Sequence, residues 1–573
     1  MTQEEKSRII SDEYVDLIVK YSGNPISLKQ FAEYSVHIMN DSYAVIYLPI
    51  SEVSTKLRTQ FTYSSLPHMY ALASDQSLEA SGVTKINRTT SLQLRGDGVL
   101  VGLIDTGIDY THPVFLHEDG TTKIMAIWDQ SIDSEDQYPR IPYPAFYGTE
   151  YTAEQINQAL RSGNPLQIVP SVDENGHGTM LAGIAAGSLN QTNDFIGVVP
   201  DSDILAVKLK KAKVFYKNFY HIPEEAVAYQ ENDIIWALEY LIDTARKLQR
   251  PIAICIGLGT SLGVHDNNGT LNTMVSIAGD FPGVALTVPA GNEGSARRHF
   301  FSTISPKGDA VVVELNVGGN EQGFTMELWG NPPMIYTMDI LSPNGEYISR
   351  ISENLSKNQE IAFVFEQTVI DIDYIMVESD TGLQLIVLRF RNPTQGVWRF
   401  QVYGRGDLPG EFNIWLPPDQ FISRETYFTN ATSNTTVTSP GNSIVPITIT
   451  AYNSGVSNIY PESGRGYTMS NMIKPDLAAP GVNIQCPDLN HGFTAITGTG
   501  AAMAHAAGIT AMVLEWSVVR GNFPKIDTVG IKKFLIRGAK RSSNLTYPNR
   551  DWGYGMIDIY NAFSILRADI TGR

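Results

Sequence analysis

The sequence predicts an α/β fold in which a parallel sheet carries helices on both faces and an antiparallel β-domain is inserted. Two observations lead to this prediction. Between about residues 97 and 300, nearly continuous apolar runs such as Gly98–Ile104 alternate with amphipathic helical segments. This alternation is typical of strands buried on both faces of a sheet. Residues 301–431 instead carry short strand-like runs broken by Gly, Pro, Asn and Asp, which is typical of an antiparallel sandwich.

The chain is therefore expected to divide into four segments. Residues 1–76 form a small α+β unit, residues 77–300 and 432–573 are two parts of one α/β-domain, and residues 301–431 are the insert. In the first unit, the predicted strands are Tyr14–Tyr21, Ser35–Met39 and Tyr43–Leu48, and Ser51–Leu57 is a predicted helix.

The α/β-domain has strand and helix patterns in alternation. Its predicted strands are Gly98–Ile104, Ile204–Lys208, Ile252–Leu258, Val284–Val288 and Ile447–Ala451, and its predicted helices include Asp233–Leu248 and Ala501–Trp516. Asn232 is expected to cap the first of these helices.

Composition and charge exclude several classes of protein. Of the 573 residues, 42 are Lys or Arg and 60 are Asp or Glu, so the net charge of −18 disfavours binding to nucleic acid or anionic membranes. The two cysteines, Cys255 and Cys486, are too few for a disulfide framework or a cysteine-rich zinc site. We expect no metal site, no cofactor, no signal peptide and no membrane span, and we expect synthesis in the cytoplasm.

Three segments could carry chemistry. Asp105 follows the first buried strand, in the box Leu103–Asp109. His177 lies in Asn175–Thr179 at the start of a helix of small residues, and Thr497–Gly508 is a glycine-rich turn that leads into another such helix. Taken separately, Asp105 could be a capping residue and His177 a structural histidine. The glycine-rich turn of the third segment has the geometry that exposes a nucleophile at a helix N-terminus.

Together the segments resemble the subtilisin family of serine proteases, because Asp, His and the serine box occur in that family's order. Pro289–Gly294 matches the family's AGN box, and Lys474–Gly481 matches its KPDxxAPG box. The resemblance implies that Asp105 orients His177 and that Asn292 donates into an oxyanion hole. It also implies that Gly257, Leu258, Gly259, Ala290 and Gly291 line the substrate cleft.

The chain departs from the family at the nucleophile. Gly500 occupies the serine position and has no side chain that could attack a carbonyl. Thr499 is adjacent, but the turn is expected to aim its hydroxyl elsewhere. Ala504 replaces the proline usual in this helix, and His505 is interpreted as structural.

Within this family, the chain resembles the Csp-type proteases of clostridial spore germination, which have a prodomain and an inserted jelly roll. This resemblance implies that residues 1–76 are a prodomain bound in the substrate cleft. The junction is expected at Gln76–Ser77, with residues 73–76 running along Gly257–Gly259. It also implies a spore-associated location and, as partners, a protein substrate or another Csp-type protein.

Three functions remain open from the sequence. The first is a pseudoprotease with a regulatory or binding role. The second is an active serine endopeptidase that processes a germination hydrolase precursor, with its serine substituted by Gly500. The third, suggested by the β-rich insert alone, is a carbohydrate-binding or structural protein.

Overall fold

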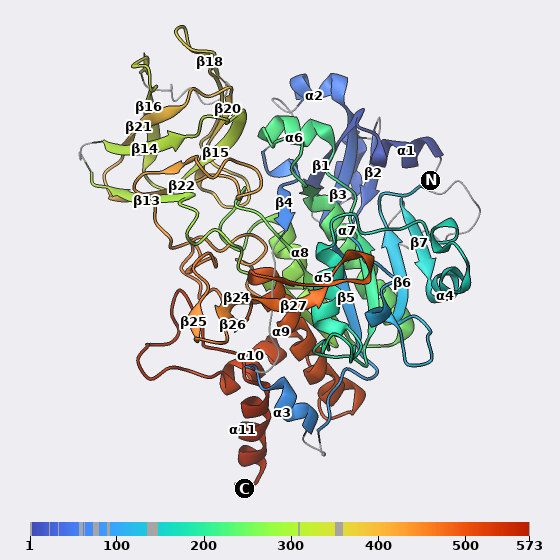
Figure 1. The fold of residues 1–573 in the computed structure, drawn as a ribbon. Helices are drawn as coiled ribbons and strands as arrows, with labels where there is room; N and C mark the ends of the chain where they lie inside the picture. Colours follow the sequence, from blue (N-terminus) through green and yellow to red (C-terminus); the bar gives the residue numbers. More distant parts are fainter. Residues whose placement is uncertain are drawn as a thin grey trace.

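A large central sheet organises the computed structural model (Figure 1). The structure describes residues 3–571 except for 22, 24, 32–33, 57–60, 62, 73–79, 89–91, 134–146, 307–309 and 350–358. Within this part of the chain, nine strands form the sheet in the order β25-β24-β12-β10-β5-β8-β6-β7, with β26 also beside β24. The parallel strands are β5 (Leu100–Asp105), β6 (Ile124–Asp129), β8 (Asp203–Lys208), β10 (Ile252–Ile256), β12 (Val284–Pro289), β24 (Ile447–Asn453) and β26 (Leu477–Pro480). The strands β7 (Thr149–Thr152) and β25 (Asn458–Ile459) pair antiparallel.

Helices cover both faces of this sheet, which confirms the predicted α/β class. On β5, Leu100 and Ile104 pack with helices α7 (Glu231–Leu248) and α8 (Thr270–Gly279). Val101 and Leu103, on the opposite face, share a core with α5 (His177–Ala186), α9 (Thr499–Leu514), α10 (Thr528–Gly538) and α11 (Ile559–Thr571).

The predicted cap of α7 is wrong. The helix begins at Glu231, so Asn232 lies inside it. The side-chain amide of Asn232 instead donates to Asp16 at 3.1 Å and to Asp233 at 3.3 Å, because these buried carboxylates need donors.

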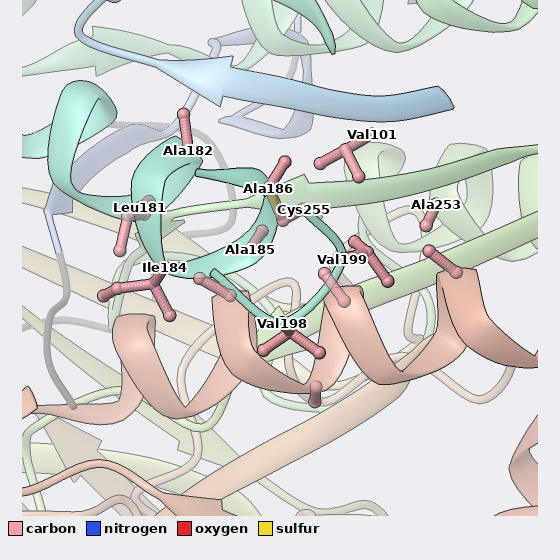
Figure 2. Packing of buried hydrophobic residues seen from close by; sticks show 14 of the residues in the cluster. Val101, Leu181, Ala182, Ile184, Ala185, Ala186, Val198, Val199, Ala253 and Cys255 are labelled. Carbon is pink, nitrogen blue, oxygen red and sulfur yellow. The ribbon is translucent and has the colours of Figure 1, made fainter. Parts of the chain in front are cut away.

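Small residues let α5 and α9 pack closely beneath the sheet (Figure 2). A Cβ atom added at Gly508 would lie 2.4 Å from Cβ of Val198, so the backbone of α9 approaches the chain too closely for a side chain there. Among the described residues, the stretch Thr499–Val519 is long and apolar enough to cross a membrane, but 83% of its apolar window is buried inside the protein. It is therefore a core helix.

The N-terminal unit carries its own sheet and sends one further strand into the α/β-domain. Its sheet has the order β1 (Tyr14–Lys20), β3 (Tyr43–Pro49), β2 (Ser35–Ile38), flanked by helices α1 (Gln3–Ile10) and α2 (Ile50–Lys56). The strand β4 (Met69–Leu72) pairs antiparallel with β11 (Leu258–Gly259) and with β9 (Tyr229–Gln230). The unit is therefore joined to the α/β-domain by backbone pairing.

The insert consists of two antiparallel sheets that share one core, as the sequence predicted. In the described residues, one sheet has the order β13 (His299–Ile304), β22 (Gly410–Trp415), β15 (Gly323–Gly330), β20 (Gln384–Arg391), β19 (Val369–Ile375), β18 (Gln359–Ala362). The other has the order β17 (Tyr347–Ile348), β16 (Ile335–Leu341), β21 (Gly396–Arg405), β14 (Val311–Val317), β23 (Tyr427–Phe428). The insert forms a separate lobe in Figure 1. The four domain boundaries given above stay predictions.

The described fold also contains several shorter helices and strands. They are α3 (Val83–Arg88), α4 (Ala153–Arg161), α6 (Val214–Tyr220), β27 (Ile484–Pro487) and β28 (Phe493–Ile496).

Candidate active site

Asp105 and His177 meet at the carboxyl end of the central sheet. Asp105 is the last residue of β5, His177 is the first residue of α5, and both side chains are buried. Nδ1 of His177 lies 2.7 Å from Oδ1 of Asp105, which also accepts a hydrogen bond from the Thr106 N–H at 2.8 Å. A carboxylate can only accept, so Nδ1 is the donor. In the neutral ring, Nε2 is then left as a proton acceptor.

Asp173 holds this pair in place, and sequence reasoning did not identify it. Its Oδ1 accepts from Thr106 Oγ1 and the Gly176 N–H, and its Oδ2 accepts from the N–H and Oγ1 of Thr179, all at 2.8–3.0 Å. Thr106 Oγ1 in turn accepts from the Gly178 N–H at 2.9 Å. Asp173 thus ties the loop after β5 to the first turn of α5. The available signal was an Asp shortly before a helix start, a common capping pattern.

Asn292 and Thr499 bring the AGN segment to the start of α9. The amide Oδ1 of Asn292 accepts from both the N–H and the Oγ1 of Thr499, each at 3.1 Å. The hydroxyl of Thr499 is thereby engaged, and Nδ2 of Asn292 remains as a donor. This is the orientation that an amide needs in order to donate to a developing oxyanion.

Gly500 is the second residue of α9 and is buried. It lies beside the contact between Asn292 and Thr499 but contributes no functional group. His505, further along the helix, is fully buried, and its Nε2 lies 2.5 Å from Oγ of Ser81. Burial lowers the pKa of His505 to about 3, so its ring is neutral and fits the structural interpretation.

The cleft strand predicted at Gly257–Gly259 pairs with the N-terminal unit. Leu258 lies opposite Leu72 and Gly259 opposite Ala71. The described strand opposite Leu258 and Gly259 is Met69–Leu72, whereas the predicted residues 73–76 and Ser77 lie outside the described residues. At Gly257, a Cβ atom would lie 2.1 Å from Oδ2 of Asp105, so glycine is required for the strand to pass this carboxylate.

Thr438 lies between Gly259 of β11 and Gly291, which follows β12, and it was missed from the sequence. Its N–H donates to the Ala290 carbonyl at 3.1 Å. A Cβ atom would lie 2.6 Å from Thr438 Oγ1 if added at Gly259, and 2.4 Å if added at Gly291. The Thr438 hydroxyl is buried and has no hydrogen-bond partner within the described structure. It therefore occupies the space that the two glycines leave open.

No metal cluster accompanies this site in the part of the chain that the structure describes. There, no three His, Cys, Asp or Glu side chains lie close enough together to hold a metal ion. What the arrangement offers is a His–Asp pair, an oriented amide and a peptide-binding strand.

Comparison with known families agrees with this geometry. The model of the subtilase family matches residues 96–293 and 423–555, which is more than half of the chain. The chain belongs to the subtilase family. The unmatched segment between the two ranges contains strands β13 to β22 of the insert.

Several subtilases are similar to this chain. The subtilisin-like protease SBT3.1 of Arabidopsis thaliana is 24% identical over 73% of this chain and 53% of its own length. The minor extracellular protease Vpr of Bacillus subtilis is 22% identical over 84% of this chain and 53% of its own length. The chain thus spans about half the length of these relatives. Among solved structures, the CspB protease of Clostridium perfringens has a TM-score of 0.75 and 29% identity, covering 85% of this chain and 98% of that one.

Proposed function

We propose that this chain is a subtilase-fold pseudoprotease that binds and regulates but does not cleave peptides. The observation that carries this proposal is Gly500 at the position of the nucleophile, beside an otherwise complete set of supporting groups. His177 has a lone pair for a proton but no hydroxyl at position 500 from which to take one. Without the nucleophile, such a site retains only about 10³–10⁴-fold acceleration over water, from binding and oxyanion stabilisation.

The ligand of the cleft is the chain's own N-terminal unit. Its strand β4 pairs with both β11 and β9, as a peptide substrate would. Tyr70 of this strand is fully buried, and its hydroxyl lies 3.4 Å from Oγ of Ser439. A cleft filled in this way excludes other peptides until β4 leaves, which suits a regulatory protein.

The proposed setting is spore germination. The likeness to the CspB protease, at 29% identity over nearly all of that chain, supports this assignment. We place the protein in the spore after synthesis in the cytoplasm. Its proposed partners are a protein substrate held without cleavage, or another Csp-type protein.

Peptide turnover tests the proposal. The purified chain is incubated with a set of fluorogenic peptides, with an active subtilase as the positive control. We expect no turnover above that of a Gly500→Ala variant, which is equally unable to attack a carbonyl. Turnover by the original chain that is lost in a His177→Ala variant would overturn the proposal.

A second candidate is an active endopeptidase whose serine is substituted at position 500. The observation that favours it is the retained geometry, with 2.7 Å between His177 and Asp105 and 3.1 Å between Asn292 and Thr499. A Gly500→Ser variant separates the two candidates. Complete self-processing near Gln76 would favour the enzyme, whereas partial or absent processing in a folded variant would favour the pseudoprotease.

A further inference from the structure

A polar hollow lies between the insert and the α/β-domain, away from the cleft. It encloses about 210 Å³, and the residues that line it include Phe301, Asn331, Glu411, Asn413, Asn471 and Arg550. Phe301 on β13 lies opposite Asn413 on β22, and Glu411 is two residues from Asn413 along the same strand. These three side chains therefore share one face of the sheet.

The floor of the hollow is built from buried polar groups. Asn413 is 4% exposed, and its amide contacts Nε2 of His299 at 2.9 Å. Nδ1 of His299 donates to the Asn434 carbonyl at 2.6 Å, and the ring stacks on Trp415 with 4.5 Å between centroids. Burial lowers the pKa of His299 to about 4, so the ring is neutral at pH 7. His299 thus holds the side-chain amide of Asn413, a residue that lines the hollow.

The walls carry hydrogen-bonding groups that no protein group uses. Within the described residues, the side chains of Asn331, Glu411 and Asn471 have no protein partner. Arg550 is already engaged, because its Nη1 donates to the Gly466 carbonyl at 2.7 Å and its guanidinium lies over the ring of Tyr467. The groups that remain are amides, threonine hydroxyls, one carboxylate and the other N–H groups of the Arg550 guanidinium.

We propose that this hollow binds a neutral monosaccharide. Sugar hydroxyls both donate and accept, so they suit side-chain amides and a carboxylate. Phe301 is 45% exposed and offers an apolar surface for the C–H face of a sugar ring. The volume of about 210 Å³ lies below the roughly 300–1,000 Å³ of pockets for drug-sized ligands, which suits a ligand as small as one sugar ring. This site is independent of the function proposed for the cleft.

Saturation-transfer NMR on the full chain tests the proposal, with D-glucose and N-acetylglucosamine as separate probes. At least one sugar should bind saturably with a millimolar dissociation constant. The variants Glu411→Ala and Asn331→Ala should each weaken that binding about fivefold, which corresponds to one lost hydrogen bond. A Gln401→Ala variant, which removes an amide from the other sheet of the insert, should bind like the original chain.

Two results would overturn the proposal. They are no saturable binding of either sugar, or equal binding by all three variants. Unchanged melting temperatures of the Glu411 and Asn331 variants ensure that a loss of binding reflects the hollow and not the fold.

Discussion

Replacing Asp16 with alanine is expected to detach the N-terminal unit from the α/β-domain. Asp16 lies in β1, is fully buried, and forms an ion pair with Lys213, which is 3% exposed. The other carboxylate oxygen, Oδ2, accepts hydrogen bonds from the side chains of Gln230 and Asn232 at 3.1 Å each. Burial lowers the pKa of Lys213, and Asp16 only partly offsets this effect. The Asp16→Ala variant therefore leaves a buried ammonium group without its carboxylate.

The expected magnitude follows from this burial. Removing one partner of a buried ion pair destabilises by about 3–5 kcal/mol. At about 1.4 kcal/mol per factor of ten, the ratio of docked to undocked N-terminal unit falls by roughly two to three and a half orders of magnitude. The double variant Asp16→Leu, Lys213→Met should recover part of this loss, because it removes the stranded charge but still leaves the Gln230 and Asn232 amides without their carboxylate acceptor.

Amide hydrogen exchange in strands β1 and β3 measures the effect. Asp12→Ala is the matched control, since Asp12 is exposed and accepts one hydrogen bond from the Val214 N–H. The amides of β1 and β3 should exchange nearly as slowly in the control as in the original chain. In the Asp16→Ala variant they should exchange at least a hundredfold faster than in the original chain. Equal exchange in both variants would refute the reasoning that this ion pair anchors the unit.

Three further predictions concern the cleft. Burial alone would lower the pKa of His68, but Glu231, 3.3 Å away, outweighs it and raises that pKa. The ion pair is then complete below about pH 6.5 and is lost as the pH rises through the raised pKa of His68. Amide exchange in β4, corrected for intrinsic rates, should therefore accelerate towards alkaline pH. A His68→Gln variant should lose this pH dependence. Gly259→Ala should lower the free energy of unfolding by about 1–3 kcal/mol, because the added methyl group clashes with Thr438. In a double-mutant cycle, Thr438→Gly should relieve most of that loss. Strictly additive effects of the two substitutions on the free energy of unfolding would contradict this packing. Asp173→Ala should destabilise by at least about 3 kcal/mol in chemical denaturation, because several buried donors lose their acceptor; a change under about 1 kcal/mol would refute its positioning role.

The sequence predicted those parts of the fold that depend on residues close together in the chain. The apolar run Gly98–Ile104 identified a buried strand, and the boxes around Asp105 and His177 identified the groups that the structure brings to 2.7 Å. The short strands of residues 301–431 identified the sandwich because their turn residues are local signals.

Contacts between distant segments could not be predicted. Thr438 lies far along the chain from Gly259, and only the fold shows that its hydroxyl fills the gap beside that glycine. The pairing of Asp16 with Lys213 is likewise invisible in either local sequence. The pairing of Leu72 with Leu258 depends on how the N-terminal unit docks, so it could not be read from the local sequence.

Intact mass spectrometry after incubation with a fluorophosphonate probe tests the central claim most directly. Because Gly500 provides no nucleophile, the account predicts one unlabelled chain of 63.1 kDa that retains its N-terminal unit. Stoichiometric labelling, or a new N-terminus at Ser77, would contradict it, because either result requires another hydroxyl to act as the nucleophile.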